Sequence, residues 1–232
     1  TVTFTMPGNN VTLTPNYKQY YTITSDDAAV IIKVDDTKAG KALPGQTIRA
    51  WAPNKDGWEF EKWNATGIDL GNGVNKNWIT FKMPESNVTL NPQYAKLHAI
   101  EVVNGRADIT SAKEGTKVTV TADFRPGYEF DRWEVNNGDV AVANKNAEET
   151  TFVMPDKPVT AVAKYKKLLG ITVNSGKAYV EGAVTDAALK GKPVVIKADK
   201  IEGKRFDQWK IVSGNVILDN QRAPEARFTM PE

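Results

Sequence analysis

The chain has 232 residues, no cysteine and one histidine, and its 30 basic side chains nearly balance 28 acidic ones, for a formal charge of +2. These counts exclude disulfides, thiolate metal sites and a cysteine nucleophile, and the small net charge argues against nucleic acid as a partner. No apolar run approaches the roughly 20 residues of a membrane helix, so membrane insertion is not expected.

The N-terminal segment, residues 1–18, contains two motifs that return later in the chain. Phe4 opens the first of four Phe-x-Met-Pro tetrapeptides, which together hold all four methionines and recur roughly every 70 to 77 residues. Val11 opens the first of three Val-Thr-x-x-x-x-Tyr segments. Because a fixed period of this kind sets the architecture of a protein, the repeats are the strongest signal in the sequence. Since the chain begins and ends within patterned sequence, we expect it to be an internal piece of a longer protein.

Within each repeat the pattern predicts short strands in a constant order. A segment rich in Val, Ile and Thr comes first, at 47–50, 118–122 and 194–198. A Gly-x-[Glu/Arg]-Phe-[Asp/Glu]-x-Trp motif follows, beginning at Gly57, Gly127 and Gly203. Further strands are predicted at 138–142 and 214–218, hairpin turns at Asn104-Gly105 and Ser175-Gly176, and at most a single helical turn at 185–190 or 145–149.

The fold class is therefore predicted to be all-β or mainly β, with tandem small domains. The expected division is a C-terminal remnant of a preceding repeat at 1–18, complete repeats at 19–96 and 97–167, and a repeat at 168–232 that lacks its last strand. The junctions between repeats are very short, which favours an extended array.

The recurring aromatic residues and methionines are expected to form the core of each repeat. These residues are Phe60, Trp63, Met83, Phe130, Trp133, Met154, Phe206, Trp209 and Met230. Phe and Trp three positions apart lie on opposite faces of a regular strand, so a bulge or other local irregularity is expected if both pack inward.

The repeats resemble the divergent B-repeat of internalin B, most closely in residues 127–133, 151–155 and 159–165. Such repeats occur in arrays on secreted and wall-anchored bacterial surface proteins. The resemblance implies compact β-grasp-like domains in an extracellular stalk or adhesin segment, with no catalytic residues and no cofactor. The third repeat departs from the pattern, with Lys204 in place of the aromatic residue, and the first repeat has a longer segment at 66–77.

Trp51, Trp58 and Trp78 are the strongest candidates for a ligand-binding site because they occur only in the first repeat. Exposed aromatic rings stack on sugars and anchor protein partners, and the alternative is that these three rings fill a larger core or a junction. Other candidates have simpler explanations. His98 is expected at a surface or junction, and the acidic pairs 26–27 and 35–36 lack a calcium-loop pattern. The lysines at 164, 166, 167, 190, 192, 197 and 200 are expected to form a solvated face.

Three functions remain open at this point, and none of them is catalytic. The chain is either a spacer of a cell-surface protein, or a module that binds a host protein or glycan through the first repeat, or an accessory part of a secreted hydrolase. The N-terminal segment matches the strand that the third repeat lacks, so weak head-to-tail self-association is a further hypothesis.

Overall fold

The computed structural model describes residues 3–136 and 140–231, and these are almost entirely strands and connecting loops. Their only helical element is a single 3-10 turn, η1 (Gly71–Gly73). The all-β fold class is thus confirmed. The chain divides into two compact units, residues 1–97 and 98–232, and the second unit contains two of the sequence repeats.

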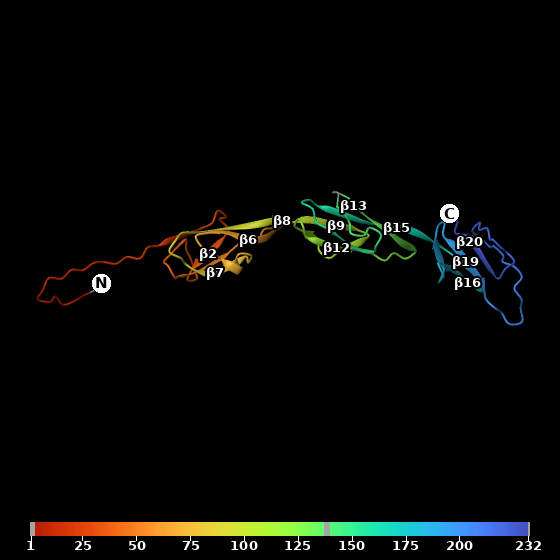
Figure 1. Ribbon diagram of the computed structural model, residues 1–232, viewed down its shortest axis with the longest axis horizontal. Helices are drawn as coiled ribbons and strands as arrows, with labels where there is room; N and C mark the ends of the chain where they lie inside the picture. Colours follow the sequence, from red (N-terminus) through yellow and green to blue (C-terminus); the bar gives the residue numbers. More distant parts are fainter. Residues whose placement is uncertain (1–2, 137–139, 232) are drawn as a thin grey trace. The chain divides into compact units, whose positions relative to one another are not determined.

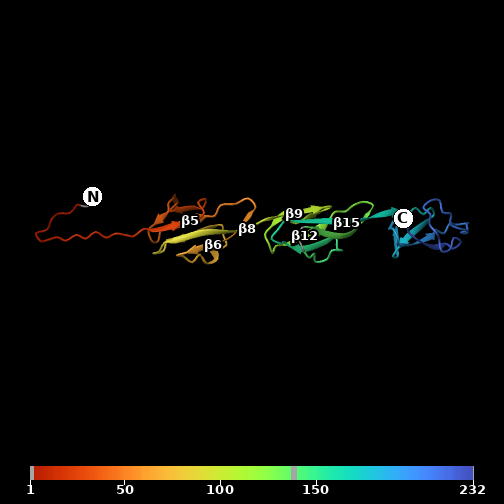
Figure 2. The same cartoon turned by 90° about the horizontal axis from the view of Figure 1, so that it is seen from above.

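The first repeat consists of two four-stranded sheets that enclose one core (Figures 1 and 2). One sheet has the order β4-β1-β8-β6 and the other β3-β2-β5-β7. Their strands are β1 (Tyr21–Thr24), β2 (Ile31–Val34), β3 (Thr37–Lys38), β4 (Lys41–Ala42), β5 (Thr47–Trp51), β6 (Trp58–Thr66), β7 (Trp78–Lys82) and β8 (Val88–Lys96). β8 pairs parallel with β1 and antiparallel with β6, so the last strand of the repeat lies between its neighbours.

The second repeat has the same plan, with sheets β11-β9-β15-β13 and β10-β12-β14. Its strands are β9 (His98–Val103), β10 (Gly105–Ala107), β11 (Ser111–Ala112), β12 (Lys117–Ala122), β13 (Tyr128–Asn136), β14 (Glu149–Val153) and β15 (Val159–Gly170). β15 again lies between a parallel neighbour, β9, and an antiparallel neighbour, β13. Parallel pairing of the first and last strands is consistent with the β-grasp-like topology that the resemblance implies.

The third repeat keeps one of the two sheets, β17-β16-β19-β20. Its strands are β16 (Gly176–Val180), β17 (Ala183–Thr185), β18 (Ala187–Leu189), β19 (Pro193–Ala198) and β20 (Glu225–Thr229). β18 pairs with residues 168–170 at the end of β15, which thereby belongs to both repeats. The predicted strand at 214–218 is wrong, because these residues are described and form no strand. The helical turn considered at 185–190 is also wrong, since this segment includes β18.

A bulge turns the Phe and the Trp of each complete repeat toward the same core. The pairing register shifts between Phe60 and Lys62 on β6, and at the equivalent place on β13. After the bulge Trp63 and Trp133 are each only 2% exposed. The irregularity expected from the Phe-x-x-Trp spacing is therefore present as an extra residue in the strand.

The Asn104-Gly105 dipeptide is a corner between the two sheets rather than the predicted hairpin turn. β9 pairs with β11 and β15, whereas β10, which starts at Gly105, pairs with β12. A Cβ atom on Gly105 would lie 2.6 Å from the Thr121 carbonyl oxygen and 2.8 Å from the Trp133 ring. Glycine at this corner allows the strand to approach the buried tryptophan closely.

We predict that Gly105→Ala lowers the free energy of unfolding by about 1 to 3 kcal/mol, the usual cost of forcing an extra carbon into a packed core. Gly170→Ala is the matched control, because a Cβ there has no heavy atom within 4 Å. Urea unfolding of both variants measures the difference. Equal stability of the two variants would contradict the proposed role of the corner.

Candidate functional site

Trp51 and Trp78 form a direct cross-strand pair on the outer face of the first repeat. Alternation along β5 buries Ile48 and Ala50, so Trp51 lies on the opposite face, where it is half-buried. The ladder between β5 and β7 places Trp51 opposite Trp78, whose side chain is 53% exposed. The tryptophans of this pair therefore do not belong to the core of the repeat.

The same position carries different chemistry in the other two repeats, although the backbone pairing is the same. The pair is Thr121 with Glu149 in the second repeat and Lys197 with Glu225 in the third. Lys197 and Glu225 form an ion pair at 3.0 Å. The tryptophan pair is specific to the first repeat.

Trp58 and Trp78 line one open cleft of about 660 Å³. Trp58 begins β6 and is 45% exposed. The remaining lining residues are mostly polar: Asn54, Glu59, Phe60, Asn75, Lys76 and Asn77. Two exposed indole rings beside amide and charged groups make a surface that stacks on flat apolar faces and hydrogen-bonds around them.

Two lysines lie over the indole rings of Trp51 and Trp78. The ammonium group of Lys33 is 5.6 Å from the Trp51 ring centroid, and that of Lys76 is 5.8 Å from the Trp78 centroid. Both contacts are within the range of cation–π attraction. Lys76 and its asparagine neighbours belong to the longer segment at 66–77 of the first repeat. The extra length of this segment is visible in the sequence, but the sequence does not reveal that residues of the segment line the cleft beside Trp58 and Trp78.

The loop before Trp58 is held by a lysine between a carboxylate and an aromatic ring. The Lys55 ammonium lies 2.9 Å from Asp27 and 4.4 Å from the Tyr94 ring centroid. A hydrogen bond from Lys55 holds the pKa of Asp27 below its ordinary value and raises the pKa of Lys55. Burial raises the pKa of Tyr94, whose hydroxyl donates to the Pro53 carbonyl at 2.6 Å. These contacts hold Pro53 and Lys55, in the loop before Trp58, against Tyr94 of β8.

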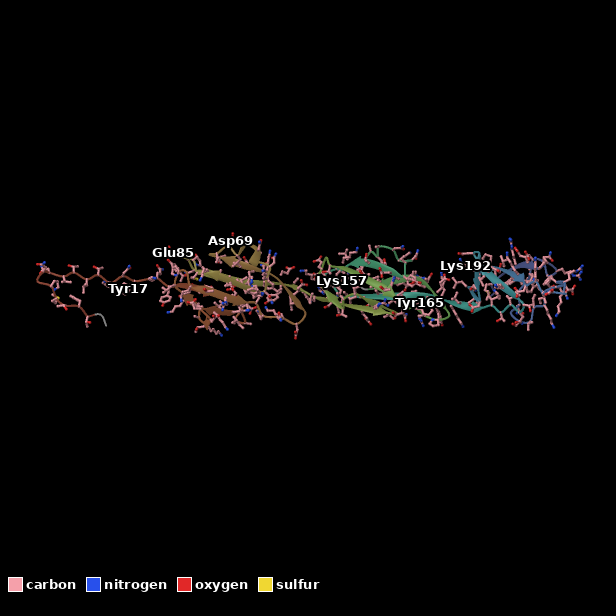
Figure 3. The ribbon with its side chains drawn as sticks, turned by 90° about the horizontal axis from the view of Figure 1, so that it is seen from below. Tyr17, Asp69, Glu85, Lys157, Tyr165 and Lys192 are labelled. Carbon is pink, nitrogen blue, oxygen red and sulfur yellow. The ribbon has the colours of Figure 1, made fainter. Side chains whose placement is uncertain are left out.

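The remaining candidates have structural partners. Lys164 pairs with Glu134, Lys166 with Asp131, and Lys192 with Glu181 at 2.7 Å, so much of the lysine face is neutralised by carboxylates (Figure 3 labels Lys192). Asp35 accepts hydrogen bonds from Gln46 and Thr47. Within 3–136 and 140–231, no group of three His, Asp or Glu side chains is placed to hold a metal ion.

His98 lies where the first two repeats join, as one of the two expected positions had it, but it is not a surface residue. Its side chain is only 6% exposed, and its Nε2 lies 2.8 Å from the Asp156 carboxylate. His98 begins β9 and pairs with Ala112 of β11. The contact joins the start of β9 to Asp156, which lies between β14 and β15.

The model of the divergent InlB B-repeat domain matches the chain three times in tandem, at residues 33–98, 97–168 and 169–232. The chain belongs to the divergent InlB B-repeat family. Membership of this repeat family of bacterial surface proteins fits a structural role, and the family is generally non-catalytic. None of the curated proteins matches the chain. No helix among the described residues of this B-repeat chain has the length and apolar character needed to cross a membrane.

We predict that Asp27→Asn lowers the free energy of unfolding by about 0.5 kcal/mol at pH 7, as expected of a partly exposed ion pair. Because the native pKa of Asp27 is depressed, its contribution is present above the unfolded pKa and is lost as the pH falls through the native value. Urea midpoints of the variant and the parent chain should therefore converge in acid. A difference that does not shrink as the pH is lowered would contradict the ion-pair explanation.

Proposed function

We propose that the chain is a load-bearing spacer segment of a bacterial cell-surface protein, located outside the cell. The observation that carries the proposal is the continuity of β15 from Val159 to Gly170. The first part of β15 is the central strand of the second repeat, and residues 168–170 pair with β18 of the third. The Leu168 amide also donates to the Gly127 carbonyl at 2.8 Å. No free linker therefore separates these two repeats, which supports a stiff connection.

The strand order within each complete repeat also suits a spacer under tension. In the second repeat, β9 enters and β15 leaves, and these two strands pair in parallel from Ile100–Val159 to Val103–Val162. Tension applied to the two ends pulls parallel neighbours past each other, which loads all the hydrogen bonds of the ladder together. Resistance to force depends on the unfolding rate, and a ladder that fails as a unit keeps this rate low.

A second candidate function is recognition of a glycan by the cleft of Trp58 and Trp78. The observation that favours it is the exposure of these rings, 45% and 53%, beside three asparagine side chains. Indole rings stack on the apolar faces of sugars, and the asparagine amides suit the surrounding hydroxyl groups. This function is compatible with the spacer role, because the tryptophan face lies outside the core. Among the described residues, no feature points specifically to an accessory role in a secreted hydrolase.

The stiffness of the junction is testable by inserting Gly-Ser-Gly between Lys167 and Leu168. The chain lacks cysteine, so Val153→Cys and Val184→Cys, at positions 59% and 62% exposed, accept spin labels in the second and third repeats. We predict a narrow distance distribution by pulsed electron paramagnetic resonance in the parent chain, and a broad one after the insertion. The same insertion between Lys200 and Ile201 is the control and should leave the distribution narrow. A broad distribution in the parent chain would overturn the spacer proposal.

Glycan recognition is testable with an oligosaccharide array, followed by calorimetry with any oligosaccharide that binds. We predict that Trp58→Ala and Trp78→Ala each weaken binding about tenfold, the loss expected for one stacked ring. Tyr128→Ala is the matched control, because Tyr128 holds the place of Trp58 in the second repeat and is 39% exposed. Absence of binding, or equal loss with the control, would leave the spacer role as the only candidate.

A further inference from the structure

The first repeat differs from the other two along the edge of one sheet. β7 is the last strand of this sheet and pairs only with β5. At one end of the ladder the Ala52 amide donates to the Asn77 carbonyl at 2.7 Å. Because main-chain groups alternate in direction along an antiparallel strand, every second residue after Asn77 turns its amide and carbonyl away from β5. These residues are Trp78, Thr80 and Lys82.

The equivalent edges of the second and third repeats are covered by other parts of the chain. The ladders make Thr151 and Arg227 the counterparts of Thr80. The Ala143 amide donates to the Thr151 carbonyl at 2.9 Å. The Asp219 amide donates to the Arg227 carbonyl at 3.0 Å, and the Asp219 carboxylate accepts from the Arg227 amide at 2.8 Å. Each of these edges is therefore capped by one residue.

The residue that would cap the edge in the first repeat is Asn72. The tryptophan amide of β6 donates to the Val74 carbonyl, and that of β13 donates to the Lys145 carbonyl, both at 2.8 Å. Val74 and Lys145 are thus equivalent, and Asn72 corresponds to Ala143, which lies two residues before Lys145. Asn72 is exposed and lies in the middle of η1.

The turn of η1 folds this segment back on itself instead of along β7. Asp69, labelled in Figure 3, accepts a hydrogen bond from the Gly71 amide at 2.8 Å, and the Gly73 amide donates to the Leu70 carbonyl at 2.9 Å. Among the described residues 3–136 and 140–231, no hydrogen bond reaches the outward amide or carbonyl of Thr80. The edge of β7 is therefore open, with main-chain groups ready to pair.

The outer face beside this edge is cationic. The four strands β2, β3, β5 and β7 contain no acidic residue, and their basic residues are Lys33, Lys38, Arg49 and Lys82. The corresponding sheets of the other two repeats carry both signs of charge, with Glu149 on β14 and Glu225 on β20. The open edge and the cationic strands occur together in the first repeat.

Three of these cations form one row that ends at the open edge. Lys38 lies opposite Lys33, Lys33 opposite Arg49, and Arg49 opposite Thr80. Arg49 pairs with Asp36, which lies between β2 and β3. Like charges directly opposite each other in a sheet are unfavourable, so the row favours negative charge placed next to Thr80.

We propose that the edge of β7 is a docking site for an extended acidic segment of another protein, which adds to the sheet as a further strand. Main-chain hydrogen bonds to Thr80 supply affinity, and the side chains on the outer face supply specificity. The proposal is independent of the spacer and glycan functions, because it rests on the main chain of β7.

The second repeat indicates the direction of the added strand. There Val142 bridges Phe152 in antiparallel fashion at the same edge. In that direction a segment places one side chain beside Lys82, another beside Thr80 two residues later, and a third beside Trp78 two residues after that. Acidic side chains suit the first two places, where Lys82 and Arg49 lie, and an aromatic side chain suits the place beside Trp78.

A second copy of the chain does not suit this edge. Two β7 strands paired about Thr80 would join two sheets that carry only positive charge on their strands. Lysine on an edge strand is a common protection against such pairing, and Lys82 has this position. The same charges attract an acidic segment.

The synthetic peptide acetyl-Thr-Glu-Val-Glu-Val-Tyr-Thr-amide is the probe, with its second glutamate placed opposite Thr80. We expect it to bind the full chain with a Kd below about 1 mM by NMR titration. Replacing both glutamates by lysine should weaken binding at least about tenfold. Hydrogen exchange should show protection of the Thr80 amide on binding, with the Thr151 and Arg227 amides unchanged.

Backbone methylation separates strand addition from attraction between charges alone. An N-methyl group on the second glutamate removes the amide that faces Thr80 and should weaken binding at least about tenfold. The matched control carries the N-methyl group on the first valine, whose amide points away from β7, and should bind as the parent peptide does.

Thr80→Pro tests the same hydrogen bonds from the side of the chain. Proline removes the outward amide but no bond to β5, a position that an edge strand tolerates, so peptide binding should fall at least about tenfold. Thr80→Val keeps the amide and should keep the affinity. If Thr80→Pro does not fold, the methylated peptides decide.

Three results overturn the proposal. The first is absence of binding by the acidic peptide, or equal binding by the lysine peptide. The second is equal binding by the two methylated peptides. The third is protection of the Thr80 amide that rises with the concentration of the chain alone, because the edge would then pair between copies.

Discussion

Each complete repeat depends on one strand, the last in its sequence, which pairs with neighbours on both sides. β8 joins β1 in parallel and β6 in antiparallel fashion, and β15 does the same with β9 and β13. The same strand supplies fully buried Val and small apolar residues to the core, and the tyrosine that packs on the Phe. Because the strand closes two hydrogen-bond ladders and one core together, half of the repeat cannot be ordered as sheet without it.

In the third repeat, none of the described residues 171–231 forms a strand equivalent to β8 or β15. Its Gly-x-x-Phe-x-x-Trp segment has the same pattern as β6 and β13, and Trp209 still donates to the Ala223 carbonyl, as Trp63 does to Lys76. Yet residues 203–212 form no strand. Strand formation there is set by the neighbour rather than by local preference, which is the general behaviour of β-structure. The opposite sheet, β17-β16-β19-β20, is complete because all its partners lie within the repeat.

These dependencies explain what the sequence alone predicts well and what it does not. Spacing within one segment gives the strands, the bulge between Phe60 and Lys62, and the buried position of Trp63, since each is a local property of a strand. Features that depend on which strands meet were missed. Asn104-Gly105 has the composition of a hairpin turn but connects two sheets, and His98 is buried although it is the first residue of its strand. The cross-strand pairing of Trp51 with Trp78 depends on the register of β5 and β7, which no local pattern reveals.

At the ladder position of Trp51 and Trp78, the side chains can change while the fold of the repeat stays the same. The same ladder position holds Trp with Trp, Thr with Glu, and Lys with Glu in the three repeats, while the backbone pairing is unchanged. Cross-strand pairs contribute only about 0.2 to 1 kcal/mol each, so the core tolerates any of them. This outer face can therefore differ from repeat to repeat without cost to the fold. An aromatic pair with one ring half-buried and the other 53% exposed is the least expected choice for a face that serves only solvation, because water does not favour exposed apolar surface. Its restriction to one repeat gives the first repeat a surface chemistry that the other two lack.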